Sequence, residues 1–262
     1  QMASSSAQAI QAQAATGGSP AEVPMIDSQD LDNLVDAAIA RPTDPAMFSL
    51  AGNSVWQKGL KPLDFVLNPY QGVTQIRSFT PDVWPNPNSK ESRINAWKQI
   101  VASNENNPNL MQRFMANTYT RTEERINNLI AELAAAQEIT TEFPESSLAA
   151  SLKMVSKMIS IREGLGMKRQ IFFVGSGGWD THGNQLTDHA HKLGQLNGAL
   201  SSFYETTEEL NVADSVTTFT ASDFSRTMTI NGDGTDHAWA GHQIVMGGGA
   251  KGLDSLKWMR HP

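Results

Sequence analysis

Two short apolar runs that flank one long amphipathic segment place the strongest limit on the fold. The runs at residues 170–174 and 216–220 have the length and composition of β-strands. Between them, apolar positions recur at helical spacing: Leu186, His189, Leu193, Leu196, Leu200 and Phe203. A strand, a helix and a strand in succession form a βαβ unit, so the sequence predicts an α/β fold with a mostly parallel sheet flanked by helices.

Three parts of the chain are expected around this unit. They are a helical or disordered lead-in at residues 1–40, an α/β domain at residues 41–252 and a tail at residues 253–262. The lead-in is rich in Ala, Ser, Gln and Gly, and Ser28 is placed to cap a short helix. Because the chain opens with Gln1, we expect both ends to be cut and targeting information to be missing.

The α/β domain is predicted in two halves. Apolar side chains at helical spacing over residues 91–163 predict a layer of helices that covers the sheet. The proline-rich stretch before it is mostly loop, with a short extended piece at residues 47–50. Residues 168–252 hold the βαβ unit and a further short strand at residues 243–246.

Composition excludes several classes of protein. A chain of 262 residues with 39% hydrophobic content can bury a core. The net charge of −7 argues against a nucleic-acid partner, because no phosphate-neutralising surface is supplied. No run reaches the roughly 20 apolar residues of a membrane span, and no signal peptide opens the chain. Since there is no cysteine, any metal would be held by histidine nitrogen and carboxylate oxygen.

All six histidines lie at or beyond His182, and several stand beside aspartates. The first such cluster, Asp180 and His182, follows directly after the predicted strand at 170–174. Ligands of open α/β sheets bind at the carboxyl ends of strands, so both side chains could turn toward one ion. The alternative is structural, with Asp180 capping the next helix and His182 facing water.

A second cluster, Ser222-Asp-Phe-Ser-Arg-Thr227, follows the strand at 216–220. Asp223 would be a ligand in the same layer as the first cluster. Arg226 would clamp an anionic substrate group, since its planar fork matches such groups. Alternatively, Asp223 and Arg226 form an ion pair that only stiffens the loop.

The third cluster lies in the glycine-rich stretch at residues 234–242 and offers Asp236, His237 and His242. Neighbouring Asp and His side chains cannot face one way on a strand or helix, but in a loop they could ligate one or two metals. The alternative is a turn-capping aspartate with surface histidines.

Together the three clusters predict a divalent-metal site with six candidate ligands: Asp180, His182, Asp223, Asp236, His237 and His242. Zinc, as one or two ions, is favoured over calcium, magnesium or manganese. His189 lies on the apolar helix face and is expected to be a structural histidine, whereas His191 should face solvent. His261 has no readable role.

A serine nucleophile is the rival interpretation. Ser176 follows a strand, and Asp236 and then His237 or His242 come later, which is the order of α/β-hydrolases. The nucleophile elbow requires G-x-S-x-G, however, and Val174 stands where its first glycine belongs.

Three motifs in this order resemble the bacterial domain-of-unknown-function family number fifteen hundred and one. They are Gly-Gly-Trp-Asp-Thr-His-Gly-Asn-Gln, Ser-Asp-Phe-Ser-Arg-Thr and Asn-Gly-Asp-Gly-Thr-Asp-His-Ala-Trp-Ala-Gly-His. Residues 49–59 are also similar to the middle of that family, and the resemblance covers roughly residues 40–252. The family is placed in the alkaline phosphatase-like superfamily, together with the sulfatases.

The resemblance implies an alkaline phosphatase-like sheet, a metal site at its strand ends, and export to the periplasm or medium. It makes ligands of Asp180, His182, Asp236, His237 and His242, and makes Asp223 the acidic residue that the family usually writes as Glu. The family motif Gly-Gly-Asn-Asp, which follows an N-terminal strand, has no counterpart before residue 40. The chain therefore resembles an N-terminally truncated member.

Three functions are open at this point. The first is a metal-dependent hydrolase of phosphate or sulfate esters, with a small anionic ester as substrate, Arg226 as anion clamp and no assigned nucleophile. The second is a serine carboxylesterase that uses Ser176. The third is a non-catalytic protein that holds a metal for binding or structure. The sequence does not specify the oligomeric state.

Overall fold

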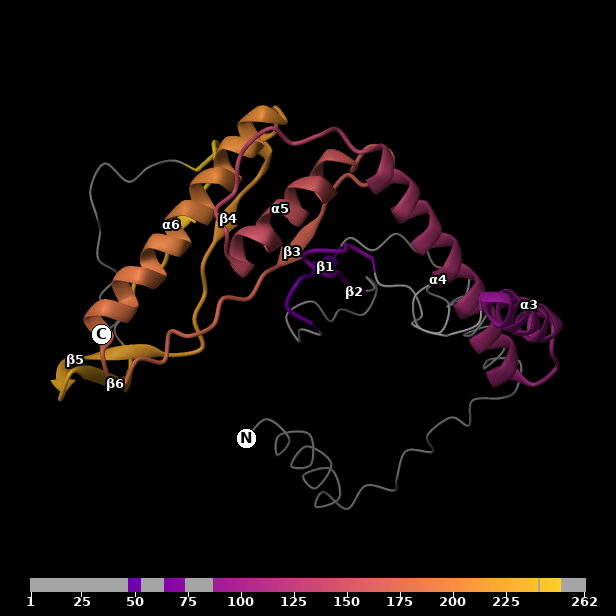
Figure 1. The fold of residues 1–262 in the computed structure, drawn as a ribbon, viewed down its shortest axis with the longest axis horizontal. Coiled ribbons are helices and arrows are strands. Elements are labelled where there is room, and N and C mark those ends of the chain that lie inside the picture. Colours follow the sequence, from indigo (N-terminus) through magenta and orange to yellow (C-terminus); the bar gives the residue numbers. More distant parts are fainter. Residues whose placement is uncertain (1–46, 53–63, 74–86, 240, 251–262) are drawn as a thin grey trace, which may run out of the picture.

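The computed structural model describes residues 47–52, 64–73, 87–239 and 241–250. In these residues the protein is a mixed α/β structure with four α-helices and a small parallel sheet (Figure 1). The predicted α/β class is confirmed at this level. The lead-in with its helix at Ser28, the tail and most of the 49–59 motif lie outside the described residues.

The parallel sheet joins chain segments that are far apart in the sequence. It consists of β1 (Met47–Ser49), β2 (Asp64–Val66) and β3 (Ile171–Phe173), in the order β2-β1-β3. Phe48 on the central strand is fully buried and stacks on Phe172, with ring centroids 5.5 Å apart. The extended segments predicted at 47–50 and 170–174 are therefore confirmed, and they are neighbours in one sheet.

The predicted βαβ pairing is wrong. The strand expected at 216–220 is β4 (Thr218–Phe219), which pairs antiparallel with β7 (Val245–Met246) instead of joining β3. Strands inside a parallel sheet are covered on both faces. Here Phe219 is 72% exposed and Val245 is 65% exposed. The two-residue ladder thus exposes one pair of side chains to solvent, although Met246 of β7 packs against the core.

Three helices account for the helical segment predicted at 91–163, and the first begins slightly before it: α3 (Pro87–Asn104), α4 (Leu110–Ala135) and α5 (Ser147–Ser160). The side chain of Asn109 caps α4 and that of Ser146 caps α5, each accepting from a backbone N–H of the first turn. The prediction of helices is confirmed. Only part of this segment covers the sheet, however, because α3 packs against α4 at the end remote from it (Figure 1).

The core lies where α5 and α6 (Gln185–Glu209) run side by side next to the parallel sheet (Figure 1). Met158 of α5 and Phe203 of α6 are almost completely buried and pack in one cluster with Phe48. Burial of apolar side chains from both helices and the sheet is the main favourable term here. Among the described helices, none is long and apolar enough to cross a membrane.

A polar clamp joins the end of α6 to the loop before α5. Both oxygens of Glu209 accept hydrogen bonds from the backbone N–H groups of Thr140 and Thr141, at 2.8 and 3.0 Å, and the Thr141 hydroxyl donates as well. The N–H of Thr140 and the other donors lower the pKa of the Glu209 carboxyl from 4.5 to about 2.

Glu209→Gln should lower the free energy of unfolding at neutral pH, because the charged acceptor of these hydrogen bonds is lost. A carboxyl whose pKa is depressed by folding stabilises the protein above its ordinary pKa. This contribution disappears as pH falls from about 4.5 toward about 2. Urea unfolding of both proteins at pH 7 and pH 3 should show a difference that shrinks in acid.

Glu208→Gln is the matched control, because Glu208 is the exposed neighbour. Equal effects of the two substitutions, or a difference that does not depend on pH, would contradict the stabilising role of the Glu209 carboxylate.

Candidate metal centre

The candidate site is built partly on a β-hairpin that was not predicted from the sequence. β5 (Ser225–Asn231) and β6 (Gly234–Ala238) pair antiparallel through the two-residue turn Gly232-Asp233. Gly232 has a φ of 76°, as the first turn residue of a type II′ hairpin requires. The expectation that 222–227 and 234–242 are simple loops is wrong, although the string Asn-Gly-Asp-Gly was the available signal.

The hairpin docks against the loop that precedes α6. The backbone N–H of Gln185, at the start of α6, donates to the carbonyl of Asp233 at 3.1 Å. The hydroxyl of Thr235 donates to the Gln185 side chain at 2.9 Å. At Gly234 a Cβ would lie only 2.3 Å from the carbonyl carbon of His182. Glycine at this position therefore lets β6 approach the loop that carries the first predicted cluster.

This docking brings together Asp180, His182 and His237. The Nε2 atoms of both histidines lie 2.8 Å from the same oxygen, Oδ1 of Asp180. One ligand atom from each residue lies within 4.8 Å of the others, and all three side chains are exposed. Two of the three predicted clusters thus supply the candidate ligand atoms, and we call these three residues the metal triad.

Arg226 links the hairpin to this loop. Its Nη2 donates to Asp180 Oδ1 and to the carbonyl of Trp179, both at 2.8 Å, and its Nη1 donates to the carbonyl of Thr235 at 2.6 Å. The side chain is 13% exposed. Its carboxylate partner is Asp180, so the alternative ion pair with Asp223 is not formed. Its role as an anion clamp stays a prediction.

Phe224 adds an aromatic support to the same group. Its ring stacks on the imidazole of His237, with centroids 4.1 Å apart and planes inclined by 12°. The guanidinium of Arg226 lies over the ring as well, 4.9 Å from the centroid. His237 is therefore held between Phe224 and Asp180, which fixes the direction of its Nε2 atom.

The electrostatics of the triad favour an ionised aspartate. The hydrogen bond from His237, followed by that from Arg226, holds the pKa of the Asp180 carboxyl below its ordinary value. Asp180 is thus a carboxylate at neutral pH, the state in which it can accept a cation.

Asp236 takes a place beside the triad. Because Asp236 and His237 are adjacent on β6, their side chains leave opposite faces of the strand. The Oδ1 of Asp236 lies 3.4 Å from Nδ1 of His182, on the side of the ring away from Asp180, and also accepts from Asn231. Asp236 is therefore positioned to orient His182.

The other predicted site residues are not gathered with the triad. Asp223 and His242 are exposed, and neither belongs to the group of potential ligands found in the described part of the chain. Asp223 precedes the hairpin ladder, which begins at Ser225, and His242 follows its end at Ala238.

Ser176 also lies apart from the triad. Its hydroxyl oxygen accepts from the indole N–H of Trp179 at 3.2 Å, and its partner in the described structure is thus not a histidine.

The remaining histidines behave largely as expected. His189 is half-buried, its Nε2 lies 3.2 Å from the hydroxyl of the buried Thr181, and Trp179 packs edge-on against its ring. His191 is exposed beside Gln195. His261 lies outside the described residues. The supporting roles of Trp179 and Thr181 have no distinct sequence signal, because they depend on contacts between separate elements.

The fold and site define a mixed α/β protein with an exposed Asp-His-His cluster. Residues 52–255 match the model of the family described as "Protein of unknown function (DUF1501)". Because this match spans most of the chain, the protein belongs to that family, and the predicted family membership is confirmed. Neither the curated proteins nor the solved structures contain a match to this chain.

Arg226→Lys should destabilise the protein although the charge is kept. A single ammonium cannot bond to three acceptors in the fork geometry of a guanidinium. Loss of hydrogen bonds to the Trp179 and Thr235 carbonyls should lower the free energy of unfolding by about 1–3 kcal/mol. Urea unfolding measures the change. Arg169→Lys, at an exposed position, is the control, and an equal response of both variants would refute this role.

Proposed function

We propose that this protein is a metal-dependent hydrolase of phosphate or sulfate esters that holds one divalent ion with Asp180, His182 and His237. The observation that carries the proposal is the convergence of three ligand atoms within 4.8 Å of one another. They come from two chain segments that dock only in the folded protein. A small anionic ester is the proposed substrate.

The donor set fits zinc better than the other candidate ions. Two imidazole nitrogens and one carboxylate oxygen are borderline ligands, whereas calcium and magnesium prefer oxygen throughout. Tetrahedral bonds of about 2.0–2.2 Å would place ligand atoms roughly 3.3–3.5 Å apart. The contacts of 2.8 Å between Asp180 and each histidine would have to open only slightly.

The surroundings of the triad support the same proposal. Ligating histidines usually donate their second ring N–H to a carboxylate, which fixes the tautomer. Asp236 beside Nδ1 of His182 supplies such a partner. Arg226 fixes Asp180, and Phe224 fixes His237. We therefore assign Asp236 a positioning role and propose three ligands in place of the six candidates, with one ion in place of the expected one or two.

A bound ion of this kind would supply Lewis acidity to the ester oxygens. Three protein ligands leave a coordination position open, as in catalytic zinc sites. The exposure of all three side chains gives a small ester access. Arg226 would act as an anion clamp only by exchanging one of its protein acceptors for the substrate. The nucleophile stays unassigned.

An alkaline phosphatase-like fold and export of the protein belong to this proposal as well. Membership of the family supports an alkaline phosphatase-like arrangement and export to the periplasm or medium, by resemblance. The two rival functions stay open with less support. For a serine carboxylesterase, Asp236 and either His237 or His242 would have to serve Ser176, but Asp236 and His237 lie at the metal triad.

Protein purified without chelator should contain about one equivalent of zinc. His237→Ala should abolish this stoichiometry, because a directly bound ligand is removed. Asp236→Asn should weaken zinc binding about 10–100-fold, as expected of a residue that orients a ligand. Elemental analysis and competitive titration measure these effects. His191→Ala is the matched control at an exposed histidine. Absence of stoichiometric zinc, or unchanged binding by His237→Ala, would overturn the site.

Aryl phosphates or aryl sulfates should be hydrolysed by the zinc-loaded protein. The activity should be lost with chelator and with His237→Ala, and kept in His191→Ala, as measured by release of the phenol. Ester hydrolysis that resists chelator and disappears in Ser176→Ala would instead identify the serine esterase. Bound zinc without turnover of phosphate, sulfate or carboxylic esters would identify the non-catalytic alternative.

A further inference from the structure

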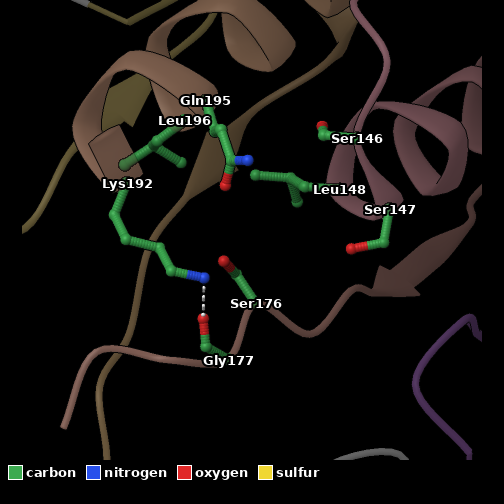
Figure 2. Close-up of a pocket in the computed structure, with 8 residues that line it drawn as sticks. All are labelled: Ser146, Ser147, Leu148, Ser176, Gly177, Lys192, Gln195 and Leu196. Carbon is green, nitrogen blue, oxygen red and sulfur yellow. Dashed lines mark hydrogen bonds between the residues drawn. The ribbon is translucent and has the colours of Figure 1, made fainter. Parts of the chain in front are cut away.

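A polar cavity lies on the loop that leads to the metal triad, but it is a separate feature. It has a volume of about 200 Å³ and lies between the first turn of α5 and the first half of α6 (Figure 2). Its walls combine one ammonium, three hydroxyls, one amide and two leucines. They are formed by Ser146, Ser147, Leu148, Ser176, Gly177, Lys192, Gln195 and Leu196.

Lys192 gives this cavity a positive charge that no lining residue balances, since no carboxylate is among them. Its Nζ donates to the carbonyl of Gly177 at 2.8 Å, so part of its donor capacity remains. Within the described residues Lys192 forms no ion pair. An unbalanced, half-buried cation is notable in a chain whose net charge is −7.

The loop opposite passes close to this ammonium. Gly178 has a φ of 81°, and a Cβ there would lie 2.7 Å from the Lys192 Nζ. The left-handed backbone conformation favours glycine at this position, and the absence of a side chain leaves room for the lysine tip without a shift. The indole of Trp179 donates to the Ser176 oxygen, which leaves the hydroxyl hydrogen of Ser176 to donate elsewhere.

Further donors face the same space. Figure 2 shows the hydroxyls of Ser147 and Ser176 and the amide of Gln195 turned toward the volume that Lys192 borders. Ser146 caps the N–H of Ala149, whereas the first N–H groups of α5 have no partner within the helix. The positive end of the helix dipole adds to the lysine charge at this wall.

We infer that this cavity binds a compact oxyanion, as a phosphate, sulfate or carboxylate group. The inference rests on an unbalanced ammonium, on the hydroxyls of Ser147 and Ser176, and on a cavity of suitable size. The amide nitrogen of Gln195 contacts His191 Nε2 at 3.0 Å, and its second N–H is left to donate to the anion. Charge-assisted hydrogen bonds from Lys192 and hydrogen bonds from Ser176 and Gln195 would hold the anion. It does not depend on the metal triad, because none of the triad residues lines the cavity.

The test uses the full chain after removal of metal by chelation and gel filtration. Phosphate, sulfate and acetate are titrated separately at constant ionic strength by isothermal calorimetry. At least one should bind saturably. Lys192→Gln should weaken that binding about tenfold or more, the loss expected for a hydrogen bond from a charged donor. Ser176→Ala, a smaller change, should weaken it severalfold.

Lys157→Gln is the matched control, because it removes the same charge from the last turn of α5. It should leave binding unchanged, and the unfolding midpoints of all variants should show that they fold. Absence of saturable binding of all three anions, unchanged binding in Lys192→Gln, or an equal loss in Lys157→Gln would overturn the inference. None of these results bears on zinc binding, so the two proposals fail separately.

Discussion

The guanidinium of Arg226 joins the two chain segments on which the candidate metal centre depends. From β5 it reaches a carbonyl on β6, and it also holds a carbonyl and a carboxylate on the loop after β3. The β5–β6 hairpin has little apolar area to anchor it, since Met228 and Ile230 are largely exposed. Polar contacts therefore replace hydrophobic burial as the force that docks the hairpin, and they also aim Asp180.

The loop between β3 and α6 serves two different surfaces. Its glycine-rich first half passes close to Lys192 and borders the polar cavity, while its second half carries Asp180 and His182. Trp179 connects the halves, because its indole holds Ser176 and its carbonyl holds Arg226. Both surfaces lie outside the apolar core, which is built from β1, α5 and α6. The core thus supplies rigidity, and the polar loop supplies two of the three candidate metal ligands.

The strongest sequence predictions concerned local periodicity. The helices over residues 91–163 and 186–203 and the strands at 47–50 and 170–174 were predictable because apolar spacing reports directly on local burial. The partner of the strand at 216–220 was not predictable, because a two-residue strand has no preference of its own, and this strand pairs with β7 and not with β3. The hairpin was not predicted although its sequence contains the Asn-Gly-Asp-Gly turn, since β6 has no run of large apolar residues and β5 leaves Met228 and Ile230 exposed.

Residue types alone determined that any metal would have to be held by histidine and carboxylate, and that all the histidines lie in the second half of the chain. Tertiary structure decided which of these candidate ligands lie close enough together to bind one ion. Asp180 and His237 are brought together by a hairpin that Gly234 and Arg226 allow to dock, whereas Asp236 leaves the other face of β6. The reason is physical: composition specifies the available donors, but metal ligation and anion binding depend on distances of a few ångströms between segments that only packing sets.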